Sequence, residues 1–473
     1  MKKFISLFLI SLLCCTAIIP MCTCAKEKEK ETVLPKLYFY GGVDRIRSKD
    51  EEINIVVKYE DGKNSFDGYA KLKWQGSSSL NYEKKNYTIK FYKDSNFDEK
   101  LKVDFGWGKQ NKYCLKANWI DKTHSRNIVT AKIAGKVQDK YNLFSDAPNN
   151  GAIDGFPIEI YLNDEFLGIY TMNIPKDAWM FNMDEDNEKH TVVVGDANNA
   201  IVNFNYNISE FLDWELEVGH NTAETLSAFN RLITFVRDSS DEEFRNNLGE
   251  YFNLDSLLNY YCIIQVAQMY DNQAKNMVLA TYDQKVWYAS LYDLDTSWGS
   301  HWNGKSLYDC TIPLQSDSIL WSKLVRTFPN ELAERYFELR NSILSNENII
   351  NEFNSFYNQI PVSAFEKENA RWKNIPGYDL NQISEFISVR TPIIDKFMVN
   401  MYTKDAGVFG YCVKNDDEVI VQIKPLRSDV VIETTDSYKL GGSSNVTFLY
   451  TDAEGNRNSL DVEVKIHKNA FEK

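Results

Sequence analysis

A predicted β-hairpin in the second half of the chain constrains the fold more than any other feature. Two runs rich in Val, Leu, Trp and Tyr, residues 277–282 and 286–292, are separated by only three residues, 283–285. This pattern is typical of two antiparallel strands joined by a tight turn. Because a hairpin brings its open ends together, we expect Asn276, before the first strand, to lie beside Asp293 or the residue preceding it.

Polar side chains flank the open end of this hairpin. Asp271 and Asn276 precede the first strand, and Asp293 and Asp295 follow the second. Carboxylate and amide oxygens suit a hard cation such as Mg²⁺, which also leaves coordination positions open for phosphate. The structural alternative for each aspartate is a turn former or a helix cap. The pattern therefore predicts a metal site at the open end of the hairpin.

The first residues have the layout of a targeting segment. Two lysines precede an apolar run, residues 4–21, and small residues then lead to Ala25. This order predicts a secretory signal peptide, residues 1–25, cleaved after Ala25. A retained membrane anchor and attachment of a lipid to Cys22 or Cys24 are the alternatives. We therefore expect a secreted or extracytoplasmic protein, held at the cell surface if the lipid is present.

Composition excludes several classes. Apolar residues make up 43% and aromatic residues 14% of the 473 residues, which is typical of a globular chain. The formal charge of −14 argues against general nucleic-acid binding, which needs a basic surface. Five scattered histidines argue against a zinc site. Outside the leader, the cysteines are far apart and suggest buried thiols rather than a disulfide framework: Cys114, Cys262, Cys310 and Cys412.

The order of hydrophobic patterns predicts an α+β fold. Residues 33–93 alternate as antiparallel strands, a helix follows near 125–137, and a second hairpin spans 157–172. Loops and helices then dominate through residue 403. We expect a small sheet-rich lobe at about 33–175 and a larger helical lobe at about 176–403.

The remaining residues, 406–473, return to strand-like alternation. This change predicts a small β-sandwich appended at the C-terminus.

A phosphate-binding loop is predicted between two strands of the first lobe. Gly76, Ser77, Ser78 and Ser79 are small enough to let backbone N–H groups approach an anion. Lys90, on the next strand, could reach the same phosphate as a point charge. An ordinary loop and a solvated lysine are the structural alternatives.

Five sequence blocks, in order, resemble the CotH family of spore-coat and secreted atypical kinases. The resemblance as a whole covers roughly residues 35–400. The blocks are residues 72–79, 84–91, 115–121 with Arg126 and Asn127, 160–170, and 292–299. The resemblance implies a two-lobed atypical protein-kinase-like fold.

The resemblance also implies roles for the candidate residues. Asp271 resembles a catalytic aspartate, and Asn276, Asp293 and Asp295 resemble the residues that hold Mg²⁺ or Mn²⁺. Gly76 to Ser79 would cover the phosphates of ATP, and Lys90 would pair with them. Two departures stand out: Met-Tyr replaces the usual His-Arg before Asp271, and the helix at 125–137 offers no acidic partner for Lys90.

Three functions follow from these patterns. The first is a secreted or surface-attached kinase that uses ATP and a divalent metal to phosphorylate Ser and Thr hydroxyls of Ser/Thr-rich secreted or surface proteins. The second is a surface binding or adhesion protein that keeps the fold without catalysis. The third is a glycosyltransferase that uses the Asp-X-Asp motif, although no nucleotide-binding βαβ pattern accompanies it.

Overall fold

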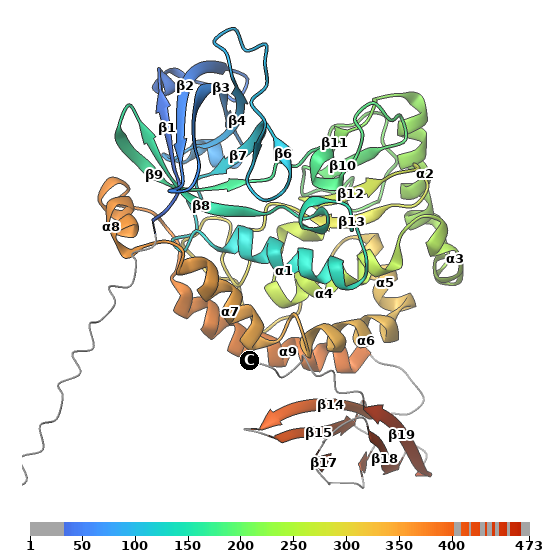
Figure 1. Ribbon diagram of the computed structural model, residues 1–473. Helices are drawn as coiled ribbons and strands as arrows, with labels where there is room; N and C mark the ends of the chain where they lie inside the picture. The colour runs from blue at the N-terminus through green and yellow to red at the C-terminus, as the bar shows by residue number, and fades with distance from the viewer. Residues whose placement is uncertain are drawn as a thin grey trace, which may run out of the picture. The chain divides into compact units, whose positions relative to one another are not determined.

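The computed structural model describes residues 33–401, 408–415, 418–425, 431–432, 438–439, 444–451 and 455–464. The expected signal peptide, residues 1–25, lies outside the described residues. Helices and strands are both abundant, which confirms the α+β class (Figure 1).

Seven strands of the first part form a closed barrel in the order β1-β2-β3-β4-β7-β9-β8. Their bounds are Lys36–Tyr40, Glu52–Glu60, Ser65–Gln75, Asn86–Tyr92, Lys112–Lys116, Glu165–Asn173 and Gly155–Leu162 in that order. Most neighbours are antiparallel, as the alternation predicts. The parallel pairing of β1 with β8 closes the barrel, and local periodicity gave no sign of it.

Alternate residues of these strands fill the barrel. Leu37 and Phe39 of β1, Leu72 of β3, and Ile89 and Phe91 of β4 are completely buried. Because side chains alternate between the two faces of a strand, the residues between them point outward. Lys90 is one of these residues.

A second sheet carries the hairpin, in the order β11-β10-β12-β13. β12 spans Met277–Thr281 and β13 spans Tyr288–Leu291, and their antiparallel register confirms the predicted hairpin. β10, Thr191–Gly195, and β11, Trp214–Val218, lie where the sequence indicated only loops and helices. That expectation was wrong because β10 is a short, fully buried run without alternation.

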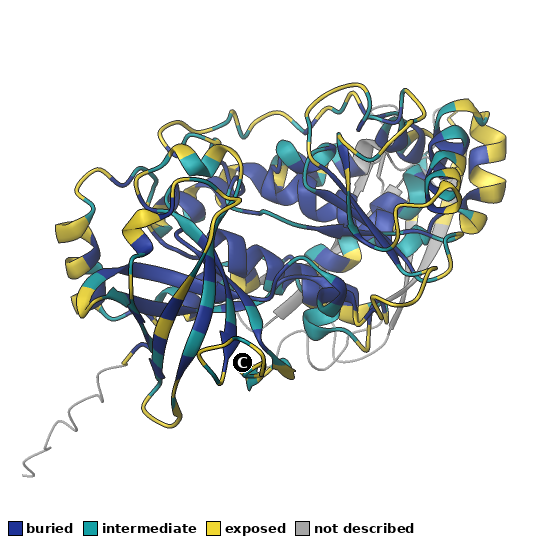
Figure 2. Ribbon diagram, turned by 90° about the horizontal axis from the view of Figure 1, so that it is seen from above, coloured by how far each residue is buried: buried dark blue, intermediate teal, exposed yellow. Residues whose placement is uncertain are grey.

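Helix α4, Leu254–Ala267, leads to the hairpin and is almost entirely buried. The Asn253 side chain accepts a hydrogen bond from Ser256 N at 2.9 Å and caps the helix, a contact that contributes about 1 kcal/mol. Helix α1, Arg126–Lys140, is also mostly buried and contacts α4. Figure 2 shows the buried strands and central helices, with exposed residues concentrated in loops and at outer helices.

The other helices surround this core. They are α2 (Ala223–Asp238), α3 (Asp241–Asn247), α5 (Ile319–Thr327), α6 (Pro329–Arg340), α7 (Asn346–Tyr357), α8 (Val362–Arg371) and α9 (Leu380–Met401). Helix α8 was not predicted, and it packs against β9 of the barrel rather than only against other helices.

The C-terminal described segments form two three-stranded sheets, β14-β15-β17 and β16-β18-β19. The strands span Val408–Asn415, Glu418–Pro425, Val431–Ile432, Tyr438–Lys439, Ser444–Thr451 and Arg457–Val464, from β14 to β19. Strands were predicted here; a sandwich and the domain limits at 33–175, 176–403 and 406–473 stay predictions.

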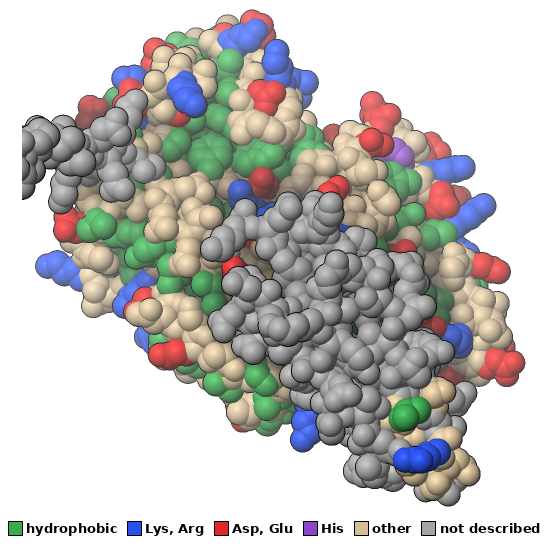
Figure 3. All heavy atoms as spheres, turned by 60° about the horizontal axis from the view of Figure 1, so that its bottom comes forward, with side chains coloured by type: hydrophobic (Ala, Val, Ile, Leu, Met, Phe, Trp, Pro, Cys, Tyr) green, Lys and Arg blue, Asp and Glu red, His purple; other side chains and the backbone are tan. Residues whose placement is uncertain are grey.

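Two surface properties of the described residues complete the fold. Acidic and basic side chains are interspersed on the face shown in Figure 3. Among the described helices, we find none with both the length and the apolar character that a membrane crossing requires.

Candidate functional site

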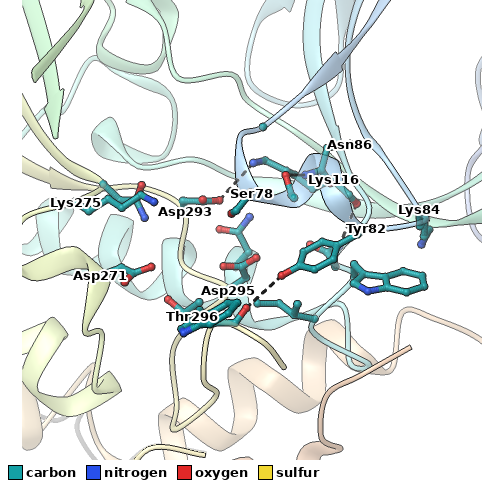
Figure 4. A pocket seen from close by; sticks show the side chains of 18 residues that line it. Ser78, Tyr82, Lys84, Asn86, Lys116, Asp271, Lys275, Asp293, Asp295 and Thr296 are labelled. Atoms are coloured by element: carbon teal, nitrogen blue, oxygen red, sulfur yellow. Dashed lines mark hydrogen bonds and ion pairs between the residues drawn. The ribbon is translucent and has the colours of Figure 1, made fainter. Parts of the chain in front are cut away.

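One pocket gathers most of the predicted site residues (Figure 4). Its lining comes from the loop between β3 and β4, the end of β7, the start of α1, and the segments on either side of the β12–β13 hairpin. The lining residues are Gly76, Ser78, Ser79, Tyr82, Lys84, Asn86, Lys116, Asn118, Trp119, Ile120, Asn127, Asp271, Lys275, Asn276, Asp293, Asp295, Thr296 and Trp302.

The Gly76–Ser79 segment faces this pocket through three of its four residues. Gly76 has φ of +114°, and a Cβ there would lie 2.1 Å from Ser79 Oγ, so only glycine fits. Asn86, at the start of β4, donates from Nδ2 to Ser79 Oγ at 3.3 Å and accepts from Ala117 N at 2.7 Å. Ser77 does not line the pocket.

Lys116, the last residue of β7, is the lysine that extends toward the acidic residues. Its Nζ lies 3.4 Å from Asp293 Oδ1, and only 11% of its side chain is exposed. Burial alone would lower the pKa of this ammonium group, but Asp293 and the other ionisable groups around it outweigh burial and raise the pKa. Lys116 therefore stays positively charged in the pocket.

The structure does not bring Lys90 to this pocket, so its predicted role is corrected. Lys90 points away from the barrel interior, and its Nζ lies 3.7 Å from Glu52 Oε2 on β2, across the intervening strand β3, with 37% of the lysine side chain exposed. Thr88 and Tyr92, two residues before and after Lys90, lie on the same face of β4 as Lys90 and do not line the pocket. Lys116 occupies the position that Lys90 was expected to fill.

Asp271 begins a short 3₁₀ turn after α4, and the backbone around it is fixed by several contacts. Gln268, the residue that directly follows α4, has a left-handed conformation, which turns the chain toward the pocket. The Asn272 side chain donates to Tyr292 O at 2.8 Å and ties this turn to the end of the hairpin. Gly195 of β10 allows close approach, because a Cβ there would lie 2.3 Å from Ala274 O.

Asn276 and Asp293 lie at the open end of the hairpin, as predicted. Met277 is paired with Leu291, so Tyr292 comes opposite Asn276 and Asp293 follows one residue later. Asn276 and Asp293 are therefore near each other but not directly opposed. Both have positive φ, 63° and 56°. Asn and Asp adopt this left-handed conformation more readily than most residues. The conformation turns both residues into the pocket lining.

Three carboxylates in one pocket strongly affect each other. Burial, followed by the charge of Asp293, raises the pKa of Asp295 to about 8, and Asp271 adds to the rise. Burial also raises the pKa of Asp271, although Lys275 lowers it. Such mutual repulsion is relieved when a cation binds between the carboxylates.

The donor set fits a hard cation only in combination with other ligands. Within the described residues, no group of three or more His, Cys, Asp or Glu side chains could hold a metal by itself. Asp293 and Asp295 would therefore need the amide oxygen of Asn276 and oxygens from a bound phosphate. Mg²⁺ characteristically uses one or two carboxylates in this way.

Helix α1 holds the acidic loop from the other side. Asn127 Oδ1 accepts a hydrogen bond from Leu294 N at 3.0 Å, between the two aspartates. Thr130 Oγ1 accepts from Trp298 Nε1 at 2.8 Å, and Trp298 N donates to Ala267 O at 2.6 Å. The loop that carries Asp293 and Asp295 is therefore anchored to both α1 and α4.

Sequence reasoning missed Lys116, Lys275 and Asn127 as pocket residues. A signal for Lys116 existed: it ends the strand that comes directly before helix α1, which is where kinases place the phosphate-binding lysine. Asn127 was part of a quoted sequence block but received no role. Lys275 lies within the turn between Asp271 and Asn276 and had no separate signal.

Comparison with known proteins gives one result. A search of the curated proteins found no match. The family model described as CotH kinase protein matches residues 72–394, which include every pocket residue named above. Because this match covers most of the chain, the protein belongs to the CotH kinase family.

Proposed function

We propose that this protein is an atypical protein kinase that transfers the γ-phosphate of ATP to Ser and Thr hydroxyls with the help of Mg²⁺ or Mn²⁺. The pocket supports this proposal by combining a Gly/Ser loop, a buried lysine, three carboxylates and an amide. Phosphoryl transfer depends mainly on positioning and charge neutralisation, and these residue types supply both.

The β3–β4 loop and Lys116 would bind the phosphates. Gly76, Ser78 and Ser79 present small side chains and accessible backbone to an anion. Lys116 keeps its positive charge at the edge of the barrel beside Asp293. The loop and this ammonium group would together neutralise part of the negative charge of a phosphate held between them.

Asn276, Asp293 and Asp295 would hold the metal ion on the other side. The bound cation would neutralise charge on the transferred phosphate. The left-handed backbone at Asn276 and Asp293 and the anchor from Asn127 keep these oxygens in place before any ligand binds. Preorganisation of this kind reduces the cost of binding.

Asp271 would orient the acceptor hydroxyl and take its proton. Its raised pKa makes the carboxylate a better proton acceptor than an exposed aspartate. Lys275, from the same turn, lowers that pKa and balances the effect of burial. It also lines the pocket close to Asp271 and Asp293 in Figure 4.

The order of elements supports a kinase-like arrangement of two lobes. The Gly/Ser loop, the lysine strand β7 and helix α1 follow each other, and the segment after β9 leads to the helices and to the Asp271 turn. This order corresponds to the parts of a protein kinase. The closed barrel, with β1 and β2 added, is a departure from that plan.

The leader sequence supports a proposal for the location and, through it, for the acceptor proteins. We infer a secreted or surface-attached enzyme, with a signal peptide or a lipid on Cys22 or Cys24, that acts on secreted or surface proteins rich in Ser and Thr. Growth with labelled palmitate would test the lipid, and fractionation would test the location.

The activity can be tested with purified protein lacking the leader. Radiolabelled ATP with Mg²⁺ or Mn²⁺ should give transfer to the protein itself or to a Ser-rich acceptor, and Asp271→Asn should abolish it. The exposed Asp98, on the far turn of the barrel, provides a matched control through Asp98→Asn. Absence of both ATP binding and transfer in the unmodified protein would favour the non-catalytic adhesion alternative.

A further inference from the structure

A buried ion pair joins the phosphate-covering loop to helix α8. Lys84 is the second-last residue of the loop between β3 and β4, and Glu368 lies on α8, 284 residues later. Their side-chain atoms are 2.7 Å apart, and the two side chains are 0% and 2% exposed. Figure 4 shows Lys84 on the opposite side of the pocket from Asp271.

The pair lies beside β9, at the point where the pairing of β9 with β7 ends. Strand β7 pairs with β9 only from Thr171 to Asn173, which leaves Ile169 without a partner on that side. Glu368 Oε2 accepts from Ile169 N at 2.7 Å, and Lys84 Nζ donates to Ile169 O and, at 3.0 Å, to Ala117 O. The two side chains therefore satisfy backbone groups that a further strand would otherwise bind.

The surroundings are shaped around this pair. Gly168 makes room for it, because a Cβ there would lie 2.6 Å from Lys84 Cε and 3.0 Å from Glu368 Oε2. The Lys84 ammonium also lies 4.4 Å from the centre of the Tyr170 ring. Burial lowers the pKa of the adjacent His124 to about 4, so this histidine is neutral. Burial also lowers the pKa of Lys84, and the charge of Glu368 opposes this effect.

Further hydrogen bonds connect the middle of the β3–β4 loop to the residue next to Lys84. Lys85 Nζ donates to Leu80 O and Tyr82 O within the loop. Tyr82, which lines the pocket, donates from its hydroxyl to Trp302 O at 3.3 Å. Movement of Lys84 would therefore be transmitted to residues that face the phosphates.

We propose that Lys84 and Glu368 are positioning residues, through which α8 holds the phosphate-covering loop in its binding conformation. This inference rests on the proposed nucleotide-binding function. Neither side chain has to touch ATP, because the pair acts through the loop backbone. The loop is then preorganised, and nucleotide affinity includes no cost for ordering it.

The experiment compares five proteins: the unmodified chain, Glu368→Gln, the double variant Lys84→Met with Glu368→Leu, Gly168→Ala, and Glu366→Gln. The last variant makes the same chemical change at an exposed position of α8. Each protein is measured for Tm, for Kd of ATP with Mg²⁺ by calorimetry, and for amide hydrogen exchange of residues 76–85.

Glu368→Gln should lower Tm, raise the Kd for ATP about tenfold and speed exchange in residues 76–85, whereas Glu366→Gln should change none of these. Removing one partner of a buried pair is strongly destabilising, whereas an apolar replacement of both is often neutral. The double variant should therefore regain part of the lost Tm, limited by the backbone groups of Ile169 that lose their side-chain partners, while keeping the weak ATP binding and the fast exchange. Gly168→Ala, which retains both charges, should reproduce the binding and exchange effects if the double variant does not fold.

Two results would overturn the proposal. The first is a double variant with a Tm above that of Glu368→Gln whose Kd for ATP is within twofold of the unmodified protein. The second is unchanged exchange of residues 76–85 in both Glu368→Gln and Gly168→Ala. If the unmodified protein binds no ATP, the nucleotide proposal fails, and the exchange measurement still decides whether α8 positions the loop.

Discussion

Lys116 Nζ lies 3.4 Å from Asp293 Oδ1, and this ion pair joins the last residue of β7 to the loop after the hairpin. In protein kinases the phosphate-binding lysine pairs with a glutamate of the following helix. Helix α1 has no acidic residue in its first turn. The carboxylate partner of the lysine is therefore an aspartate of the candidate metal site itself.

Substitutions of the two lysines should distinguish the role of Lys116 from that of Lys90. Lys116→Met removes the charge that faces the phosphates, and kcat/KM for ATP should fall roughly 100-fold or more, as when a preorganised electrostatic contact is lost. Lys90→Met is a matched control, because that side chain lies on the outside of the barrel beside Glu52. Steady-state kinetics of both variants test this, and equal losses in the two would contradict the assignment of Lys116.

Substitution of Asn127 should weaken the binding of the metal more than the binding of the nucleotide. Its Oδ1 accepts from Leu294 N, between Asp293 and Asp295, and loss of such a supporting contact typically weakens metal affinity about 10-fold to 100-fold. We expect Asn127→Ala to raise the Mn²⁺ concentration needed for half-maximal activity by at least tenfold.

Metal titrations at saturating ATP would measure this change. The exposed Asn96→Ala is the control. A uniform loss of activity at every metal concentration, with no change in the half-maximal value, would show that Asn127 does not act through the metal loop.

Local patterns were sufficient to predict the parts of the site that are close in sequence. The β12–β13 hairpin follows from alternation and a short turn, and it places Asn276 and Asp293 at one pocket. The Gly76–Ser79 loop could be predicted in the same way, because small residues lie between two clear strands.

Features that depend on distant contacts could not be predicted. Barrel closure depends on the parallel pairing of β1 with β8. Period-two alternation shows that Lys90 and Ile89 face opposite sides of β4 but does not show which side is the interior. The Lys84–Glu368 pair joins residues far apart in the sequence, so no local pattern could reveal it.

Metal affinity should depend on pH through Asp295. Burial and the Asp293 charge raise the pKa of Asp295 to about 8. Between about pH 4 and 8, the folded metal-free protein holds a proton that the unfolded chain releases, so the free energy of unfolding falls as pH rises. A cation replaces this proton, and its affinity should increase over the same range.

Calorimetric titration with Mn²⁺ between about pH 6 and 8 measures this dependence. Asp295→Asn should weaken binding and also flatten the increase with pH, because the titrating carboxyl is gone. If the variant keeps the same slope as the unmodified protein, another group is responsible for the pH dependence.

Gly195 should be essential for the position of the Asp271 turn. A methyl group at this residue of β10 would lie 2.3 Å from Ala274 O, and Asn276 N donates to Gly195 O at 2.7 Å. Gly195→Ala should push the turn away from β10, with a loss of about 1 to 3 kcal/mol in the free energy of unfolding. A shift of the turn of roughly 1 Å is enough to reduce kcat about 100-fold.

Denaturant unfolding and single-turnover kinetics would measure the two effects separately. Gly249→Ala is the matched control, because a Cβ at Gly249 meets no atom within 4 Å. A Gly195→Ala protein that loses stability but retains the unmodified single-turnover rate would show that the Asp271 turn keeps its position without this close approach.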